Sequence, residues 1–252
     1  MLTAVVRTHP GAVRTNNEDV GLCDPDLGLL ALADGMGGHN AGEVAARLAV
    51  DAVHGVLRDS AAGGTALWPV PFDDAASLAA NRVRAAMVLA GRRVFRASQE
   101  TPEYAGMGTT LTMAVVEGGR LTYSSVGDSR LYLFRDSRLR QMTRDDSMVN
   151  AVADVAGVDP ALLGRHSLGH LLTKALGPAA DIDAAVEEAE LADGDLLLLS
   201  SDGLHGGVSP LLIQAILQAG SDLARAADRL VRAALEADGR DNITVVLARY
   251  TA

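Results

Sequence analysis

Residues 29–35 read LLALADG, an apolar run that ends in an aspartate and a glycine. The pattern recurs at residues 196–203, LLLLSSDG, and residues 239–246, GRDNITVV, place the aspartate just before an apolar run. A carboxylate at the end of a buried strand is costly unless a cation compensates it, and the only lysine in the chain is Lys174. Hard divalent metal ions with oxygen ligands are the economical explanation. The pattern therefore indicates metal-assisted hydrolysis built on three aspartates: Asp34, Asp202 and Asp241.

Length and composition exclude several classes of protein. The 252 residues, 48% of them hydrophobic, suffice for a sizeable globular core. A net charge of -10 disfavours nucleic acid and anionic membranes as partners. The single cysteine, Cys23, allows no disulfide within the chain and is expected to be a core residue. Since neither a signal peptide nor an apolar run of ~20 residues is found, we expect a cytoplasmic protein.

Hydrophobic periodicity and turn residues predict an α+β layered fold rather than a parallel βαβ array. Antiparallel hairpins are expected together with long helices that Asn40, Asp73 or Asp74, and Ser221 would cap. No linker is evident, so residues 1–252 are predicted to form one domain. The expected strands are 3–7, 27–33, 109–116, 120–126, 131–134, 196–199 and 243–248, with helices from 41, after 73, at 147–156 and after 221, a loop at 61–71 and an irregular segment at 157–171.

Each motif taken alone has a competing interpretation. The strand, glycine loop and helix at residues 29–43 suggest dinucleotide binding, but Asn40 stands at the third glycine position, and Asp34 would repel a pyrophosphate. His39 is either a ligand or a capping or core residue. Residues 126–130, VGDSR, fail as a hydrolase nucleophile elbow because Leu131 replaces the second glycine. The Ser, Asp and His within residues 201–205 are sequence neighbours, which is not the geometry of a catalytic triad.

Taken together, the motifs resemble the metal-dependent serine/threonine protein phosphatases of type 2C, the PPM family, in its bacterial branch. The resemblance covers residues 5–250. It rests on seven motifs in order: Arg14 with Asn17-Glu18-Asp19, Asp34-Gly35-Met36-Gly37-Gly38-His39, Met107-Gly108-Thr109-Thr110, Val126-Gly127-Asp128-Ser129-Arg130, Thr143-Arg144-Asp145-Asp146-Ser147, Ser201-Asp202-Gly203-Leu204 and Asp241-Asn242-Ile243-Thr244.

The resemblance implies a four-layer αββα sandwich, in which two facing antiparallel sheets are flanked by helices. It also implies two Mn²⁺ or Mg²⁺ ions and a third, weaker one. Asp34, Asp202 and Asp241 match the ligands of the first ion. Asp34 bridges to the second ion, which the Gly35 carbonyl and Asp19 also hold, with Glu18 as a ligand either directly or through water. Asp34 and Asp241 are the residues expected to be essential for turnover.

Two further positions are assigned by the same resemblance. Asp128, with Asp202, matches the third-metal site, and Arg14 matches the arginine that binds substrate phosphate. Met36 stands where some members carry a histidine that is proposed as the general acid, so the acid has no assignment here. Residues 145–171 fall where the family has a mobile flap.

The function implied is hydrolysis of phosphoserine and phosphothreonine on proteins by water, with a Ser/Thr kinase as a partner and a monomeric enzyme. Two alternatives belong to other classes. A catalytically inactive phosphatase fold that acts as a binding module is disfavoured because all five aspartates are present. A nucleotide-binding oxidoreductase is disfavoured by the broken glycine spacing and by Asp34.

Overall fold

A computed structural model describes residues 1–38, 41–61, 69–159, 171–220 and 222–252. In these ranges no helix is both long enough and apolar enough to cross a bilayer. The elements in chain order are β1 (Leu2–His9), β2 (Asp19–Asp24), β3 (Leu29–Met36), α1 (Ala41–Ala61), α2 (Leu78–Glu100), the 3₁₀ helix η1 (Pro102–Tyr104), β4 (Gly108–Thr109), β5 (Leu111–Glu117), β6 (Arg120–Val126), β7 (Arg130–Arg135), β8 (Arg138–Gln141), α3 (Met148–Ala156), β9 (Val186–Glu190), β10 (Leu196–Ser200), α4 (Asp202–His205), α5 (Pro210–Gln218), α6 (Leu223–Ala237) and β11 (Ile243–Tyr250).

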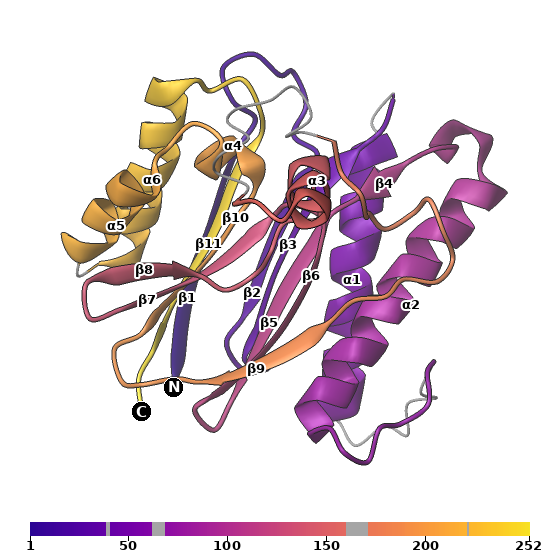
Figure 1. Cartoon of the computed structure of the whole chain (residues 1–252), viewed down its shortest axis with the longest axis horizontal. Helices are drawn as coiled ribbons and strands as arrows, with labels where there is room; N and C mark the ends of the chain where they lie inside the picture. The colour runs from indigo at the N-terminus through magenta and orange to yellow at the C-terminus, as the bar shows by residue number, and fades with distance from the viewer. Residues whose placement is uncertain (39–40, 62–68, 160–170, 221) are drawn as a thin grey trace.

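The strands form two sheets that face each other (Figure 1). One sheet has the order β1-β11-β10-β7-β8 and the other the order β2-β3-β5-β6-β9, with β4 paired to the end of β3. All the strand pairs are antiparallel. Helices α1 and α2 cover the outer face of the second sheet, and α5 and α6 cover that of the first (Figure 1). The predicted αββα sandwich is confirmed.

Side-chain alternation explains why the central strands read as continuous apolar runs. Successive side chains on a strand point to opposite faces. In β3, Leu30 and Leu32 pack between the sheets, whereas Leu29, Ala31 and Ala33 pack against the helices. Both faces of such a strand are buried, and the same division of odd and even positions occurs in two more strands, β10 and β11.

The long helices are amphipathic as the sequence predicts, but two of their caps differ from the prediction. Ser77, not Asp73 or Asp74, caps α2, and its Oγ accepts a hydrogen bond from the Ala80 amide at 2.9 Å. The Asp73 carboxylate instead accepts from the Ala75 amide two residues on, which makes a local turn. Asp222 caps α6. The proposed caps Asn40 and Ser221 lie outside the described residues.

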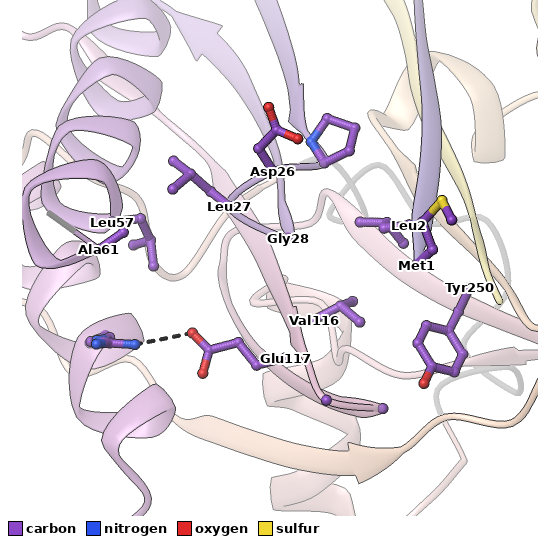
Figure 2. A pocket seen from close by; sticks show the side chains of 14 residues that line it. Met1, Leu2, Asp26, Leu27, Gly28, Leu57, Ala61, Val116, Glu117 and Tyr250 are labelled. Carbon is purple, nitrogen blue, oxygen red and sulfur yellow. Dashed lines mark hydrogen bonds and ion pairs between the residues drawn. The ribbon is translucent and has the colours of Figure 1, made fainter. Parts of the chain in front are cut away.

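A pocket of about 340 Å³ lies at the end of the sandwich where β2 ends and β3 begins (Figure 2). The Pro25–Gly28 and Glu117–Gly119 turns line it, together with Tyr250. Arg82 donates to Glu117 there at 3.1 Å. The opposite end of β2 begins at Asp19, five residues away, or roughly 17 Å at ~3.3 Å per strand residue. The two ends of the molecule are therefore well separated.

Candidate metal and phosphate site

Two of the predicted ligands are brought together by strand pairing. Asp19 opens β2 and lies directly opposite Asp34 of β3. Opposed residues of an antiparallel pair point to the same side of the sheet, with Cβ atoms ~5 Å apart. Burial raises the pKa of Asp34 well above its usual range, and the carboxylates of Asp19, Asp202, Asp128 and Asp241 raise it further. The other four aspartates singled out by the sequence are therefore all electrostatic neighbours of Asp34.

Asp19 is the most deeply buried of these carboxylates, with 6% of the residue exposed. Its Oδ2 accepts a hydrogen bond from Ser201 Oγ at 2.7 Å, while its Oδ1 is buried without a hydrogen-bond partner among the described residues. Burial, with smaller contributions from Asp202 and Asp241, raises its pKa to about 7. A buried carboxylate oxygen without a donor suits a hard cation, which binds carboxylates without needing a proton.

The remaining carboxylates reach the same place from other elements. Asp202 begins α4 immediately after β10, and Asp241 lies just ahead of β11. Asp128 lies between β6 and β7, and burial together with Asp202 and Asp145 raises its pKa to about 7. Within the described ranges no three acidic, histidine or cysteine side chains are close enough to form a ready-made metal cage. Like charges repel each other, so carboxylates are expected to stay apart when no cation lies between them. The all-oxygen donors and the unpaired Asp19 oxygen nevertheless suit a divalent ion.

Arg14 contacts Asp241 rather than Glu18 or Asp19. Its Nη2 lies 2.9 Å from Asp241 Oδ2, in an ion pair whose side chains are 58% and 44% exposed. The hydrogen bond to Asp241 is the main reason that the pKa of Arg14 is raised, while Glu18 and Asp202 add smaller contributions. An exposed pair of this kind contributes little to stability, so the guanidinium can exchange this partner for another anion.

Close backbone packing explains two of the glycines around Asp34. A Cβ added to Gly35 would lie 2.0 Å from the Gly42 carbonyl oxygen and 2.8 Å from that of Glu18. A Cβ added to Gly42 would lie 2.6 Å from Glu18 Oε2. The Glu18 carboxylate therefore lies against the first turn of α1, and only glycine allows β3, α1 and the segment before β2 to approach so closely.

Asn242 is a residue whose structural role the sequence did not reveal. Its Nδ2 donates to the carbonyls of Pro10, at 3.0 Å, and Asn16, at 2.8 Å, while its Oδ1 accepts from the Glu18 amide at 2.8 Å. These bonds fasten the segment that carries Arg14 to the start of β11. The partners of Asn242 lie more than two hundred residues away in the chain, so no local pattern predicts these hydrogen bonds. Its position next to Asp241 is the only feature of the sequence that points to the site.

Asp146 is the second residue that sequence reasoning left without a role. It exchanges two hydrogen bonds with Gly127: the Asp146 amide donates to the Gly127 carbonyl at 2.8 Å, and the Gly127 amide donates to Asp146 Oδ2 at 3.1 Å. Gly127 has φ +101°, and a Cβ there would lie 2.6 Å from Thr110 Cγ2. The turn that presents Asp128 is therefore held from both sides.

A cavity of about 780 Å³ opens beside this cluster. Asp34, Asp128 and Asp202 line one part of it. Another part is formed by residues 171–183, which include Lys174, and Met36 also contributes to the wall. Asp19, Asp241 and Arg14 do not line this cavity within the described ranges. Arg14 therefore contacts the cluster at Asp241, whereas Lys174 shares the cavity with Asp34, Asp128 and Asp202.

Two histidines and the single cysteine of the chain take no part in the cluster or lie outside the described residues. His205 Nδ1 lies 2.9 Å from Ser200 Oγ, and burial and Arg130 lower its pKa well below the usual range, which favours the neutral ring. Cys23 packs against the core between the sheets, as predicted. His39 lies outside the described residues.

The comparisons with known proteins agree with this geometry. The family model described as Protein phosphatase 2C matches residues 14–247. The chain is 40% identical to the serine/threonine protein phosphatase PstP of Mycobacterium tuberculosis over 248 residues, which are 98% of this chain and 45% of PstP. It therefore spans about half the length of that relative. It is 33% identical to protein phosphatase PhpP of Streptococcus pneumoniae over 247 residues, 95% of this chain and 94% of PhpP.

Solved structures extend the likeness to three dimensions. The crystal structure of the Mycobacterium tuberculosis phosphatase PstP/Ppp matches with a TM-score of 0.87 and 35% identity, covering 100% of this chain and 99% of that one. The PstP catalytic domain in complex with two manganese ions matches with a TM-score of 0.83 and 37% identity over 100% and 99% of the two chains. The ordered motifs, the αββα layers and the clustered aspartates thus have one common explanation, that this chain belongs to the protein phosphatase 2C family.

Proposed function

We propose that this protein is a metal-dependent phosphatase that hydrolyses phosphoserine and phosphothreonine on proteins. The observation that carries the proposal is the gathering of four aspartates from distant parts of the chain around Asp34. One of them, Asp19, has a buried oxygen without a hydrogen-bond donor among the described residues. Relatives named as serine/threonine protein phosphatases support the same activity. Because the aspartates of the cluster are all retained, the inactive binding module is the weaker alternative.

The ligand assignments are those that the resemblance to the family implies. Asp34, Asp202 and Asp241 would hold the first ion, and Asp34, the Gly35 carbonyl and Asp19 would hold the second, with Glu18 acting directly or through water. Asp128 and Asp202 would hold a third, weaker ion. Mn²⁺ is favoured by the two manganese ions in the PstP complex, and Mg²⁺ suits the same oxygen donors. When bound, such ions supply an activated water and neutralise the charge of the phosphate.

Arg14 is proposed to bind the substrate phosphate. Its planar guanidinium can present two donors to phosphate oxygens, which a point charge cannot do. The weak, exposed pair with Asp241 places the guanidinium at the edge of the cluster. In the loaded enzyme, Asp241 would ligate a metal ion, and Arg14 would turn its donors to the phosphate and stabilise charge that develops during hydrolysis.

Several finer statements belong to the same proposal. Residues 1–252 would form one catalytic domain with a flap-like segment at about residues 145–171, of which 160–170 lie outside the described residues. The protein would act in the cytoplasm as a monomer, on phosphorylated proteins that include a Ser/Thr kinase. Neither nucleic acid nor membrane is proposed as a partner, in line with the net charge of -10.

Metal dependence provides the direct test. Activity toward p-nitrophenyl phosphate and a phosphothreonine peptide should require added Mn²⁺ or Mg²⁺ and should disappear in excess chelator. A thermal-shift titration should show stabilisation by Mn²⁺ in the absence of substrate, because the ion binds the folded state. Full activity in excess chelator would contradict the proposal, and so would a melting temperature that does not respond to Mn²⁺.

Arg14→Ala separates phosphate binding from charge balance. If Arg14 binds phosphate, the variant should lose about 1.5–3 kcal/mol of affinity for inorganic phosphate, while its affinity for Mn²⁺ stays roughly the same. If Arg14 only balances Asp241, Mn²⁺ should bind more tightly to the variant because a competing cation has gone. An unchanged inhibition constant for phosphate would refute the assignment.

A further inference from the structure

We propose that Lys174 selects substrates that carry an anionic group close to the phosphorylated residue, either a carboxylate or a second phosphate. The inference rests on the proposed phosphatase function and adds a specificity determinant to it. Lys174 is the only basic residue among the described residues that line the 780 Å³ cavity beside Asp34, Asp128 and Asp202.

The cavity is larger than a phosphate group needs. Ligand pockets of about 300–1,000 Å³ hold whole drug-sized molecules, so this cavity has room for side chains that flank the phosphorylated residue. Its wall away from the clustered aspartates includes Leu171, Leu172, Pro178 and Ile182. Two further acidic residues, Asp181 and Asp183, belong to the same wall, and Arg92 pairs with Asp181 at 3.1 Å. Among the described residues of this wall, Lys174 is the only one whose side chain can offset the negative charge and bind an anionic group of a peptide.

The backbone around Lys174 is anchored on both sides to the elements that carry the aspartates. The Thr173 amide donates to the Asp146 carbonyl at 2.8 Å, and Asp146 holds the Gly127 turn next to Asp128. Leu176 and Thr109 exchange two backbone hydrogen bonds, of 2.9 and 3.0 Å. Thr109 Oγ1 in turn donates to the Asp34 carbonyl at 2.9 Å. The position of Lys174 relative to Asp34 and Asp128 is therefore fixed by the fold.

The ammonium group itself is held only weakly. Nζ lies 3.9 Å from Asp146 Oδ1 and 3.4 Å from the Asp183 carbonyl oxygen, and 52% of the side chain is exposed. Asp146 Oδ2 already accepts from the Gly127 amide. An ion pair as long and exposed as this one contributes little to stability, which leaves Lys174 able to turn toward a stronger anion.

The anion that Lys174 meets is distinct from the phosphate under attack. Arg14, the residue proposed to bind that phosphate, pairs with Asp241, and neither residue lines the cavity. Lys174 therefore reaches a substrate from the other side of the cluster, where a neighbouring acidic or phosphorylated residue of the peptide would lie.

The test compares kcat/KM for phosphothreonine peptides that differ at a single flanking position. Four peptides carry alanine, glutamate, lysine or phosphoserine there, and the position is scanned on both sides of the phosphothreonine. The enzymes are the wild type, Lys174→Ala, Lys174→Glu and Lys174→Arg, with Arg138→Ala as the matched control. Arg138 is an exposed residue of β8 that is not part of the cavity wall, and its loss changes the net charge equally.

At one or more positions the kcat/KM of the wild type should be higher for the glutamate peptide than for the lysine peptide. Lys174→Ala should reduce this glutamate-to-lysine ratio about two- to fivefold, the range of an exposed ion pair. Lys174→Glu should reverse the preference, Lys174→Arg should keep it, and Arg138→Ala should leave it unchanged. A larger gain for phosphoserine than for glutamate would identify the second phosphate as the better ligand. Equal ratios in the wild type and Lys174→Glu at every position would overturn the proposal.

The same assay separates this inference from the function on which it rests. Failure to hydrolyse both p-nitrophenyl phosphate and all the peptides in the presence of Mn²⁺ would reject the phosphatase itself. Metal-dependent hydrolysis of all four peptides, with a preference that does not depend on residue 174, would keep the phosphatase and reject the role of Lys174.

Discussion

The hydroxyl group of Ser201 donates a 2.7 Å hydrogen bond to Asp19 Oδ2, although the two residues are 182 positions apart. Ser201 also accepts from the Thr244 amide at 3.0 Å, so one buried side chain links β2, the end of β10 and β11. The hydrogen bond fixes the orientation of the Asp19 carboxylate and leaves Oδ1 without a donor from the described residues. The orientation of Asp19 that the proposed metal site would use is therefore set without a cation.

Ser201→Ala should weaken the binding of Mn²⁺. A hydrogen bond to a charged group contributes about 1.5–3 kcal/mol, so the Mn²⁺ concentration for half-maximal activity should rise by roughly tenfold or more. The control is Ser98→Ala, which removes a buried hydroxyl group that donates to the Phe95 carbonyl within α2. An Mn²⁺ requirement that changes equally in both variants would show that Ser201 has no specific link to the metal.

Asn242→Ala should destabilise the protein and also impair metal binding. The three hydrogen bonds of Asn242 hold the segment before β2, and at about 1 kcal/mol each the variant should lose roughly 2–4 kcal/mol of unfolding free energy. Asn81→Ala is a matched control, because Asn81 bonds to Asp73 and Ser77 in the same manner ahead of α2. Urea unfolding should show similar losses for both variants, whereas only Asn242→Ala should need more Mn²⁺ for activity.

Asp34→Asn should abolish turnover and yet stabilise the metal-free protein at alkaline pH. Because the folded-state pKa of Asp34 is raised, its contribution to stability is fully present below the unfolded pKa of about 3.9. That contribution is lost as the pH rises through the folded pKa. A tenfold difference in acid dissociation constant between the folded and unfolded states corresponds to about 1.4 kcal/mol, so the variant should be more stable than the wild type by at least that amount at pH 8. The difference should shrink toward pH 4.5.

Urea unfolding in excess chelator at several pH values would measure this difference. Asp26→Asn in the Pro25–Gly28 turn is a suitable control, because Asp26 lies in the pocket at the other end of the sandwich (Figure 2). The prediction fails if metal-free Asp34→Asn is less stable than the wild type at pH 8.

His205 should make the protein sensitive to acid. Its folded-state pKa is lowered, so its contribution to stability is present above the unfolded pKa of about 6.5 and is lost as the pH falls toward the folded pKa. Between pH 6.5 and pH 5.5 the loss is about 1 kcal/mol, and below that range it approaches about 1.4 kcal/mol per pH unit until the folded pKa is reached. His205→Gln should remove this part of the slope when unfolding free energy is measured against pH. Identical slopes in the two proteins would show that His205 is not buried in its neutral form.

The sequence predicted the layers well because the central strands carry their own signal. Leu196–Ser200 is apolar on both faces, as a strand covered by a second sheet and by helices must be. Strand β2, by contrast, was missed, since DVGLCD holds two aspartates and a glycine. Packing from the facing sheet favours Gly21 there, since an added Cβ would lie 2.8 Å from Val6 Cγ1 and would force that side chain to shift. A contact of that kind is invisible in a local window of sequence.

The same reason limits what the sequence could say about the site. Asp34, Asp128 and Asp202 each adjoin a glycine at the edge of a strand, and Asp241 lies two positions after Gly239. Asp19 has no such signal and is assigned only by the resemblance to the family. The groups that orient them, such as Ser201, Asn242 and Asp146, are polar residues whose partners lie far away in the chain. Asp146 and Gly127 are 19 positions apart, and nothing in the pattern of either motif pairs them.

The pairing of β1 with β11 has a consequence for biosynthesis. Leu2 lies opposite Tyr250 and His9 opposite Ile243, and β11 also separates β1 from β10 in the sheet. During translation β1 must wait, without its neighbour, until more than two hundred further residues have left the ribosome. Asp241 emerges with that last strand. A nascent chain therefore cannot assemble the cluster of aspartates until β11 has left the ribosome, and the proposed phosphatase activity would begin only after that.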